Sequence, residues 1–372
     1  MFAQVSGDEK PVSGFFLTGK PPRGLGRVVE LILGRGGRNK TVMQAWKELL
    51  EREKPDLVWA HNIAGGEKWG WSIELLSCAR KFCPVFWTLH DMWGLADGSE
   101  SYWQEDKAVE GGRGQGAERS GPKVQKFEGE KVGSGEESRV SRVCGENGKY
   151  PVTLTAPSRW LADLTKKITG QECVFLPNPI DLKIFSPGDQ IAARRRFGLP
   201  EEGLVVLAGA DSLADPRKGF DLLREAWGSA RGKGATLALL GRHGENRSGE
   251  KYLGNLASDE QMVAAYRAAD LYVHPARMEN APCTIQESLA CGTPVLAFAV
   301  GGIPEMVIPG KNGFLAGKPD AATLGEALAL ALAKRDRLSR MRSECRSAAE
   351  EIWRPEALVG RFLGVVERVR GR

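Results

Sequence analysis

The chain has 372 residues, of which 42% are hydrophobic and 27% are charged, and its formal net charge is +5. This length and composition predict a soluble globular protein with two domains of ordinary size. They exclude a transmembrane helix, since no run of 18 apolar residues occurs, and no motif of a nucleic-acid-binding module is present. The modest positive charge is compatible with contact to anionic lipid surfaces or phosphorylated substrates, or with an ordinary solvated surface.

The cysteines and the N-terminal residues indicate the cellular compartment in which the protein is expected. Seven cysteines are scattered along the chain without CxxC pairs or zinc-binding spacing. Such an odd, scattered set is typical of a reducing cytoplasm. The N-terminus also lacks the charged and then apolar pattern of a signal peptide. We therefore expect a cytoplasmic protein, with peripheral contact to the inner face of the membrane as an open alternative.

Short apolar runs alternate with helical patterns along the chain. The predicted strands lie at residues 57–60, 85–89, 152–155, 173–176, 204–208, 236–240, 271–274 and 295–297. The predicted helices lie at residues 42–53, 73–81, 220–227 and 259–269, the last with a capping box from Ser258 and Gln261. This alternation predicts an α/β fold with parallel sheets built from βαβ units.

Prolines and low-complexity sequence divide the chain. Two prolines in three residues, at 177–179, stop any regular element. We therefore expect a first domain over 1–178, a second over 179–352, and a terminal helix over 353–372. Between residues 110 and 149, Gly, Ser and charged residues dominate, and such a segment cannot bury enough surface to offset its ordering entropy. We expect a disordered insertion there, either merely tolerated or acting as a lid.

The segment 278–292 carries the clearest chemical signal. It places Glu279 and Glu287 between two predicted strands, with a loop and a helix start between the carboxylates. The carboxyl ends of parallel strands form the ligand-binding edge of open α/β sheets, and a helix N-terminus there offers free N–H groups to an anion. The carboxylates can accept hydrogen bonds from sugar hydroxyls. The alternative is structural: Thr284 and Glu287 form a capping box, and Glu279 is a solvated loop charge. The loop residues expected to line the anion site are Asn280, Ala281, Pro282 and Cys283.

Two further strand ends carry candidate residues. Arg217 and Lys218 are adjacent cations between a predicted strand and a helix, a pattern that suits a diphosphate group but also occurs in solvated turns. Gly209, at the exit of the same strand, is a candidate nucleotide-binding residue. His90 follows the predicted strand 85–89 and could contact a sugar hydroxyl or developing charge, or pack without a chemical role under Trp93.

The remaining positions are weaker. His61 lies at the end of another strand, Ser158 is a suitable helix N-cap, and Arg159 beside it is a candidate for the ligand-facing surface. No HExxH motif or compact His, Cys and carboxylate cluster occurs, so we expect no metal site.

The two glutamates, followed by Ala-Cys-Gly-Thr-Pro-Val and then Gly-Gly-Ile-Pro-Glu, resemble the donor-site block of family 4 retaining glycosyltransferases. The sequence His-Asp-Met-Trp from His90 and the segment Pro-Asn-Pro-Ile-Asp from Pro177 also match that family, and the resemblance covers roughly residues 55–317. It implies the GT-B fold, in which two Rossmann-like halves face each other across a cleft. The Pro-Asn-Pro-Ile-Asp segment would cross between the halves, and the terminal helix would return to the first.

The resemblance also implies a role for each candidate residue. Arg217 and Lys218 would hold the donor diphosphate, aided by the backbone N–H groups near 280–283. Glu287 would hold the ribose hydroxyls, Glu279 the hydroxyls of the donor sugar, and His90 would face that sugar from the other domain. No cofactor and no obligatory metal are implied, since fixed cations and helix dipoles stabilise the leaving group.

The chain departs from the family pattern on the acceptor side. Family members begin with an apolar strand and a Gly-rich turn that residues 1–20 lack, so we expect an incomplete first domain. After Trp93, residues 96–99 replace the usual Gly-Gly-Cys stretch. The expected function is transfer of a sugar from a nucleoside diphosphate sugar to a saccharide or lipid-linked acceptor, as in surface polysaccharide assembly. The alternatives are a non-catalytic sugar-nucleotide-binding protein and another GT-B enzyme, such as a sugar-nucleotide epimerase.

Overall fold

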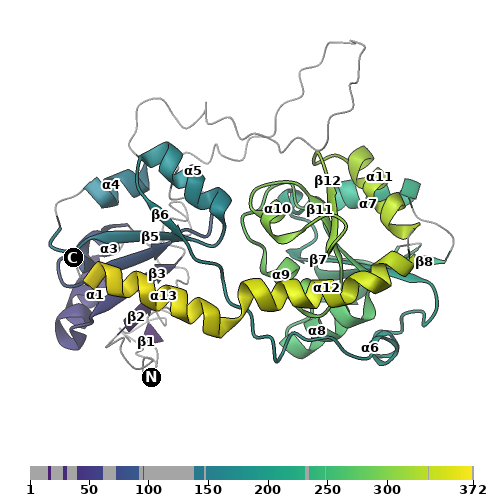
Figure 1. Ribbon diagram of the computed structural model, residues 1–372, viewed down its shortest axis with the longest axis horizontal. Coiled ribbons are helices and arrows are strands. Elements are labelled where there is room, and N and C mark those ends of the chain that lie inside the picture. The colour runs from purple at the N-terminus through teal and green to yellow at the C-terminus, as the bar shows by residue number, and fades with distance from the viewer. Residues whose placement is uncertain are drawn as a thin grey trace, which may run out of the picture. The chain divides into compact units, whose positions relative to one another are not determined.

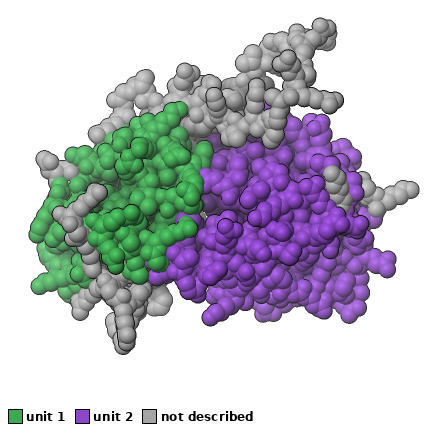
Figure 2. Space-filling model, in the orientation of Figure 1, with its two compact units in different colours: residues 1–117, 127–176, 360–372 green, residues 118–126, 177–359 purple. Residues whose placement is uncertain are grey.

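The chain forms an α/β protein with two compact units (Figure 2). The computed structural model describes residues 16–17, 28–31, 40–61, 73–91, 95, 138–145, 148–230, 234–247, 249–333 and 335–370. Among these, unit 1 contains the residues up to 176 and those from 360 onward, and unit 2 contains residues 177–359.

Unit 1 is built on a six-stranded sheet of order β1-β2-β3-β4-β5-β6. Its strands are β1 (Phe16–Leu17), β2 (Val28–Leu31), β3 (Leu57–His61), β4 (Val85–Thr88), β5 (Val152–Ala156) and β6 (Cys173–Phe175). Strand β1 is antiparallel to β2, and the other neighbours are parallel. The four strands predicted in this half are therefore confirmed. Every residue of β4 is buried, as expected for a parallel sheet that is covered on both faces.

Helices cover this sheet. They are α1 (Lys40–Glu53), α3 (Glu74–Ala79), α4 (Arg139–Gly145), α5 (Arg159–Thr169) and the end of α13 (Pro355–Arg370). Helix α13, yellow in Figure 1, stacks the ring of Phe362 on Trp59 with centroids 4.4 Å apart. Val365 and Val366 join the same apolar cluster as Leu57. The apolar stripe of the terminal helix is thus buried against the strands of unit 1.

Unit 1 differs from the sequence-based expectations in two respects. Residues 139–145 lie inside the predicted disordered insertion, but they form a helix whose Val140 and Val143 are fully buried. Burial of these two valines supplies the apolar surface that the average composition of the segment hides. The rest of the predicted insertion up to residue 137 lies outside the described residues. The parallel strand β2 was not predicted, and residues 1–15, like 96–99, lie outside the described part of the chain.

Unit 2 is built on a fully parallel six-stranded sheet of order β12-β11-β10-β7-β8-β9. Its strands are β7 (Leu204–Ser212), β8 (Ala235–Arg242), β9 (Glu250–Gly254), β10 (Leu271–His274), β11 (Val295–Phe298) and β12 (Gly313–Ala316). The chain builds outward from β7 to β9, returns to place β10 on the other side of β7, and then builds outward again. The direction of winding therefore reverses between β7 and β10, which is where doubly wound sheets bind ligands.

Helices pack on both faces of this second sheet (Figure 1). They are α6 (Gln190–Arg196), α7 (Phe220–Ala230), α8 (Asp259–Ala268), α9 (Cys283–Ala290), α10 (Ile303–Met306), α11 (Ala321–Leu332) and α12 (Arg335–Trp353). Helix α7 packs against α11, whereas α8 packs against α6 and α9, and α9 packs against α12. The predicted capping box of α8 is confirmed, with Ser258 and Gln261 each bonding the backbone of the other.

Candidate functional site

The site is built where β7 and β10 end beside each other. After β7, the chain forms a 3₁₀ turn, η3 (Pro216–Lys218), before α7 begins. After β10, the chain forms a loop over residues 275–282 before α9 begins. Both connections leave the carboxyl edge of the sheet at the point where the winding reverses, and this geometry brings Lys218 to Glu279.

A cation and a carboxylate meet at this edge. Asp215 caps η3 by accepting a hydrogen bond from the Arg217 N–H at 2.9 Å. The turn then directs the Lys218 ammonium onto Oε1 of Glu279, with which it forms an ion pair. His274, the buried last residue of β10, places its Nε2 3.6 Å from the same oxygen.

These neighbours determine the charge of Glu279. Burial opposes ionisation, but His274 and the Lys218 ammonium outweigh it and lower the pKa of Glu279 to about 2. The side chain therefore carries a full negative charge at neutral pH, although only 18% of it is exposed. A carboxylate in this state is a strong acceptor for hydroxyl donors.

Gly219 allows η3 to approach β10. Its φ of +67° is left-handed, and a Cβ on it would lie 1.9 Å from the carbonyl oxygen of Pro275. We expect Gly219→Ala to lower the free energy of unfolding of unit 2 by about 1–3 kcal/mol, because the backbone must shift or remain strained. Urea denaturation measures this change. The matched control is Gly228→Ala in α7, where a Cβ meets nothing within 4 Å and helix propensity should add about 0.5–1 kcal/mol. Equal effects of the two alanines would contradict the expectation.

Arg217 lies in the same turn, but its side chain pairs with Asp215, the N-cap of that turn. Its Nε and Nη2 donate to the Asp215 carboxylate at 3.1 and 2.7 Å, and about half of its side chain is exposed. A third cation, Arg277, was not predicted. Its backbone N–H donates to the Arg217 carbonyl at 2.9 Å, and its guanidinium pairs with Asp221 at 2.6 Å. Only the adjacency of β7 and β10 reveals that Arg277 belongs to this edge.

The second glutamate has a different partner. Helix α9 begins at Cys283 with Pro282 as its N-cap and without a side-chain capping bond. The capping-box alternative for Thr284 and Glu287 is therefore wrong, because Thr284 already lies inside the helix. Glu287 instead accepts a hydrogen bond from the hydroxyl of Tyr266 at 2.8 Å, and burial raises the pKa of its carboxyl group. Tyr266 was not predicted, since an aromatic residue in a predicted helix is indistinguishable from a core residue.

The loop before α9 contains the other predicted ligand residues. Asn280 and Pro282 are buried, Ala281 is half-buried, and Cys283 is exposed on the first turn of the helix. Gly209 lies within β7, where a Cβ would come within 2.3 Å of the Leu240 side chain. This close packing accounts for the glycine by itself, and its contact with a nucleotide stays a prediction.

In unit 1, two histidines meet at the ends of adjacent strands. His61 ends β3 and His90 follows β4, and their ring nitrogens Nδ1 and Nε2 lie 2.9 Å apart. Burial and the neighbouring His90 lower the pKa of His61 to about 3, and burial also lowers the pKa of His90. Both rings are thus neutral at pH 7, and one donates a hydrogen bond to the other. The structure pairs His61, the weaker candidate, directly with His90, while Trp93 lies outside the described residues.

Ser158 and Arg159 begin α5 in the same unit. Ser158 caps the helix, as predicted, by accepting from the Leu161 N–H at 3.0 Å. The Arg159 guanidinium lies over the ring of Phe175 at 4.4 Å from its centroid. Within the described residues, no three His, Cys, Asp or Glu side chains gather as a metal site would require. In the same part of the chain, no helix has the length and apolarity needed to span a membrane.

Part of the chain is similar to known glycosyltransferase sequences. Residues 213–351 match the profile of the Glycosyl transferases group 1 family. The D-inositol 3-phosphate glycosyltransferase of Geodermatophilus obscurus is 35% identical over 188 residues, which are 44% of this chain and 41% of that protein. The enzyme of the same name from Stackebrandtia nassauensis is 29% identical over 209 residues, 50% of this chain and 46% of that protein. The chain thus spans less than half the length of these two curated relatives.

Solved structures share the fold across most of the chain. Sucrose-phosphate synthase from Thermosynechococcus elongatus has a TM-score of 0.65 at 19% identity, covering 89% of this chain and 77% of that one. HepE of Anabaena, solved in complex with UDP, has a TM-score of 0.63 at 17% identity, covering 88% and 82%. Residues 213–351 of the chain are therefore similar to the glycosyl transferases of group 1, and its two α/β units share the GT-B fold of these solved structures.

Proposed function

We propose that the protein is a retaining glycosyltransferase that moves a sugar from a nucleoside diphosphate sugar to a hydroxyl group of a saccharide or lipid-linked acceptor. The observation that carries this proposal is the meeting of Lys218 with Glu279 at the edge where the winding of the second sheet reverses. A cation for phosphate and a carboxylate for hydroxyls are the two groups that a sugar diphosphate requires. Support also comes from the names of the relatives and from the HepE structures with UDP and UDP-glucose.

Each residue has a role that fits its environment. Lys218 would leave Glu279 for the donor diphosphate, assisted by Arg217 and the N–H groups at the start of α9. Glu279, ionised at neutral pH, would then accept hydrogen bonds from the donor sugar, and Glu287 from the ribose. His90, neutral at pH 7, would contribute from unit 1 a hydrogen bond to the sugar.

The reaction balances without a metal ion. The bond between the sugar C1 and the diphosphate oxygen breaks, and its electron pair leaves with the diphosphate. The acceptor oxygen forms the new bond to C1, and its proton passes to an oxygen of the departing diphosphate. Lys218 and Arg217 would stabilise the charge that grows on the leaving group, a role that fixed cations perform well in a site shielded from water.

Location and acceptor form part of the same proposal. Seven free cysteines and a net charge of +5 support a cytoplasmic protein that contacts an anionic membrane surface. A lipid-linked acceptor would be presented at such a surface. Sedimentation with vesicles of phosphatidylcholine alone, and with added phosphatidylglycerol, tests this part separately.

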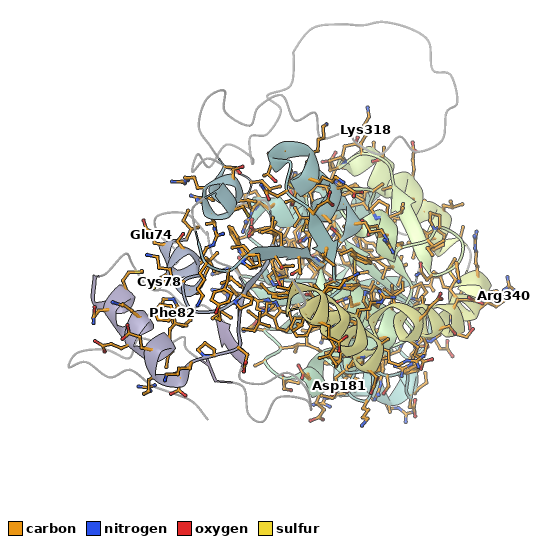
Figure 3. All side chains as sticks on the ribbon, turned by 60° about the vertical axis from the view of Figure 1, so that its left-hand side comes forward. Glu74, Cys78, Phe82, Asp181, Lys318 and Arg340 are labelled. Atoms are coloured by element: carbon orange, nitrogen blue, oxygen red, sulfur yellow. The ribbon has the colours of Figure 1, made fainter. Side chains whose placement is uncertain are left out.

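The central test is calorimetric titration with UDP, GDP, ADP and their glucose conjugates. We expect one nucleotide class to bind, and Arg217→Ala to weaken that binding by about 10- to 100-fold, since a charge-assisted hydrogen bond contributes ~1.5–3 kcal/mol. Arg340→Ala, an exposed cation on α12 (Figure 3), is the control and should bind normally.

Three outcomes separate the functions. Consumption of the donor with transfer to an acceptor supports the glycosyltransferase. Binding without transfer or hydrolysis would indicate the sugar-nucleotide-binding protein instead, an alternative favoured by the confinement of the family match to residues 213–351. Failure of folded protein to bind any nucleotide would contradict both.

A further inference from the structure

The side chain of Glu287 is hydrogen-bonded to a buried tyrosine, Tyr266. The Tyr266 hydroxyl donates a hydrogen bond to Oε2 of this carboxylate at 2.8 Å. We propose that Tyr266 is a positioning residue of the nucleotide site, which fixes one oxygen of Glu287 and leaves the other for a ribose hydroxyl. This inference rests on the proposed function and adds to it a residue that need not contact the ligand.

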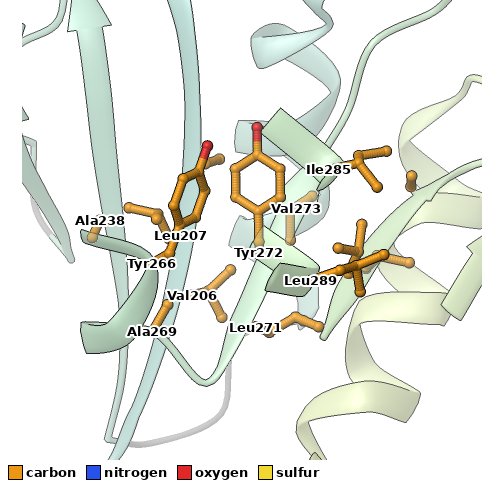
Figure 4. Packing of buried hydrophobic residues seen from close by; sticks show 14 of the residues in the cluster. Val206, Leu207, Ala238, Tyr266, Ala269, Leu271, Tyr272, Val273, Ile285 and Leu289 are labelled. Atoms are coloured by element: carbon orange, nitrogen blue, oxygen red, sulfur yellow. The ribbon is translucent and has the colours of Figure 1, made fainter. Parts of the chain in front are cut away.

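The tyrosine is itself immobilised. It is 0% exposed, and its ring packs edge-on against Tyr272 with centroids 5.5 Å apart. Figure 4 shows the two hydroxyl groups at the same end of the paired rings. The Tyr266 carbonyl accepts from the Thr293 hydroxyl at 2.7 Å, and Ser288 of α9 donates to the Thr293 carbonyl at 2.9 Å. The carboxylate and its hydroxyl donor are therefore held in one hydrogen-bonded frame of α8, α9 and the start of β11.

The charges around Glu287 suit a neutral ligand group. Glu279 is matched by the Lys218 ammonium, whereas Glu287 has no ion-pair partner among the described residues. Its neighbours are Tyr266 and Asp259 on α8, Tyr272 on β10, Cys283 on α9, and Cys291, the C-cap of α9. A carboxylate with such neighbours repels phosphate and attracts hydroxyl donors. The chemistry favours a ribose diol over an anionic group at this position.

Tyr266 also favours the ionised form of this carboxyl group. Burial raises the pKa of the Tyr266 phenol well above its ordinary value, so the hydroxyl stays a donor. Burial likewise raises the pKa of Glu287, and Asp259 adds to this, but the hydrogen bond from Tyr266 opposes both. Without the hydroxyl, the pKa of Glu287 should rise further, and the carboxylate would be lost at a higher pH as the solution is acidified.

The experiment compares ribonucleotides with their 2′-deoxy analogues. Wild-type protein is titrated calorimetrically with UDP, ADP and GDP and with dUDP, dADP and dGDP, between pH 5 and pH 8. We expect wild type to prefer the ribonucleotide of its class, and Tyr266→Phe to bind it about tenfold more weakly while binding the deoxy analogue almost unchanged. The loss of ribonucleotide binding on acidification should begin at a higher pH in Tyr266→Phe.

The matched control is Tyr252→Phe. That hydroxyl also bonds within unit 2, donating to the Gly241 carbonyl at 2.6 Å, but it does not contact Glu287. It should keep the wild-type ribose preference and pH profile. If Tyr266→Phe fails to fold, Thr293→Val tests the same frame by removing the hydrogen bond to the Tyr266 carbonyl, and it should reduce ribose preference about two- to threefold.

The outcomes distinguish the two levels of the proposal. If Tyr266→Phe keeps the wild-type preference for the ribonucleotide, the positioning role is overturned and the proposed function stays intact. If only Thr293→Val folds, the same result in that variant has the same meaning. Wild-type binding without ribose preference would overturn the role of Glu287 and, with it, that of Tyr266. Absence of nucleotide binding by the folded wild type would overturn the proposed function itself.

Discussion

Lys218→Ala should lower the turnover of sugar transfer by about 10²–10³-fold, the usual cost of removing one group that stabilises a growing negative charge. The Lys218 side chain pairs with Glu279, a predicted carboxylate, and the Arg217 side chain pairs with its own cap, Asp215. Its loss removes the charge that would receive the diphosphate and leaves Glu279 without its ammonium partner. Donor consumption, followed by chromatography of the released nucleoside diphosphate, measures the effect.

A second lysine provides the control. Lys318→Ala removes an exposed lysine from the same unit, outside the turn that carries Lys218 (Figure 3), and it should leave turnover within twofold of wild type. Transfer by Lys218→Ala at the wild-type rate would contradict the assignment of the diphosphate site. Equal losses in both variants would indicate a general effect of charge on the protein rather than a site.

Lys218→Ala should also change how the stability of the folded state depends on pH. The lowered pKa of Glu279, about 2, means that its ionised form stabilises the folded state above its ordinary pKa of about 4.3. That contribution is lost as the pH falls from about 4.3 towards 2. Lys218→Ala removes part of the cause, so the stability difference from wild type should be present at pH 6 and shrink at pH 3. A difference that does not depend on pH would show that the ion pair is not its source.

The fold was largely accessible from the sequence because buried parallel strands are continuous apolar runs. The strands at 271–274 and 295–297 were predicted within one residue of their ends, since all their residues are buried. Strand β9 was missed, because it lies at the sheet edge and none of its residues is fully buried. Strand β12 was missed because four residues, two of them small, carry no periodicity.

Individual residues of the site could be predicted from the sequence, but their contacts could not. Lys218 and Glu279 are separated by 61 residues, and their contact depends on β10 returning past β8 and β9 to lie beside β7. Alternation of strands and helices does not determine that order. The start of α9 shows the same limit on a smaller scale. Thr284 and Glu287 have the spacing of a capping box, but the helix begins earlier, at Cys283 after the N-cap Pro282. Glu287 therefore accepts a hydrogen bond from Tyr266 instead.

Replacing Arg194 with methionine should lower the free energy of unfolding of unit 2 by about 3–5 kcal/mol, the usual cost of breaking a buried ion pair from one side. The side chain is 2% exposed, and its Nη2 lies 2.6 Å from Oδ2 of Asp270. It also donates to the carbonyls of Ala268 at 3.0 Å and Glu201 at 2.8 Å. Methionine has a similar length but no donor, so it would leave the Asp270 carboxylate without its guanidinium partner and remove the donor from the two carbonyls.

The position of this pair explains why the effect should reach the site. Asp270 also accepts from the Val205 N–H at 2.7 Å, so the pair ties the start of β7 to the start of β10. These are the two strands whose far ends carry Lys218 and Glu279. Loss of Arg194 should therefore weaken nucleotide binding as well as stability, although the arginine lies at the opposite end of the strands.

Two further variants isolate the cause. Arg195→Met removes the adjacent arginine, whose pair with Glu201 is exposed at 66% and 48% of the two side chains, and it should cost about 0–1 kcal/mol. The double variant Arg194→Met with Asp270→Leu removes both charges and should recover part of the loss, because no buried carboxylate remains. Urea denaturation followed by tryptophan fluorescence, to which Trp227, buried in α7, contributes, measures all three. Equal costs for Arg194→Met and Arg195→Met would mean that the pair does not join the strands, and that the backbone hydrogen bonds and packing hold β7 beside β10 without it.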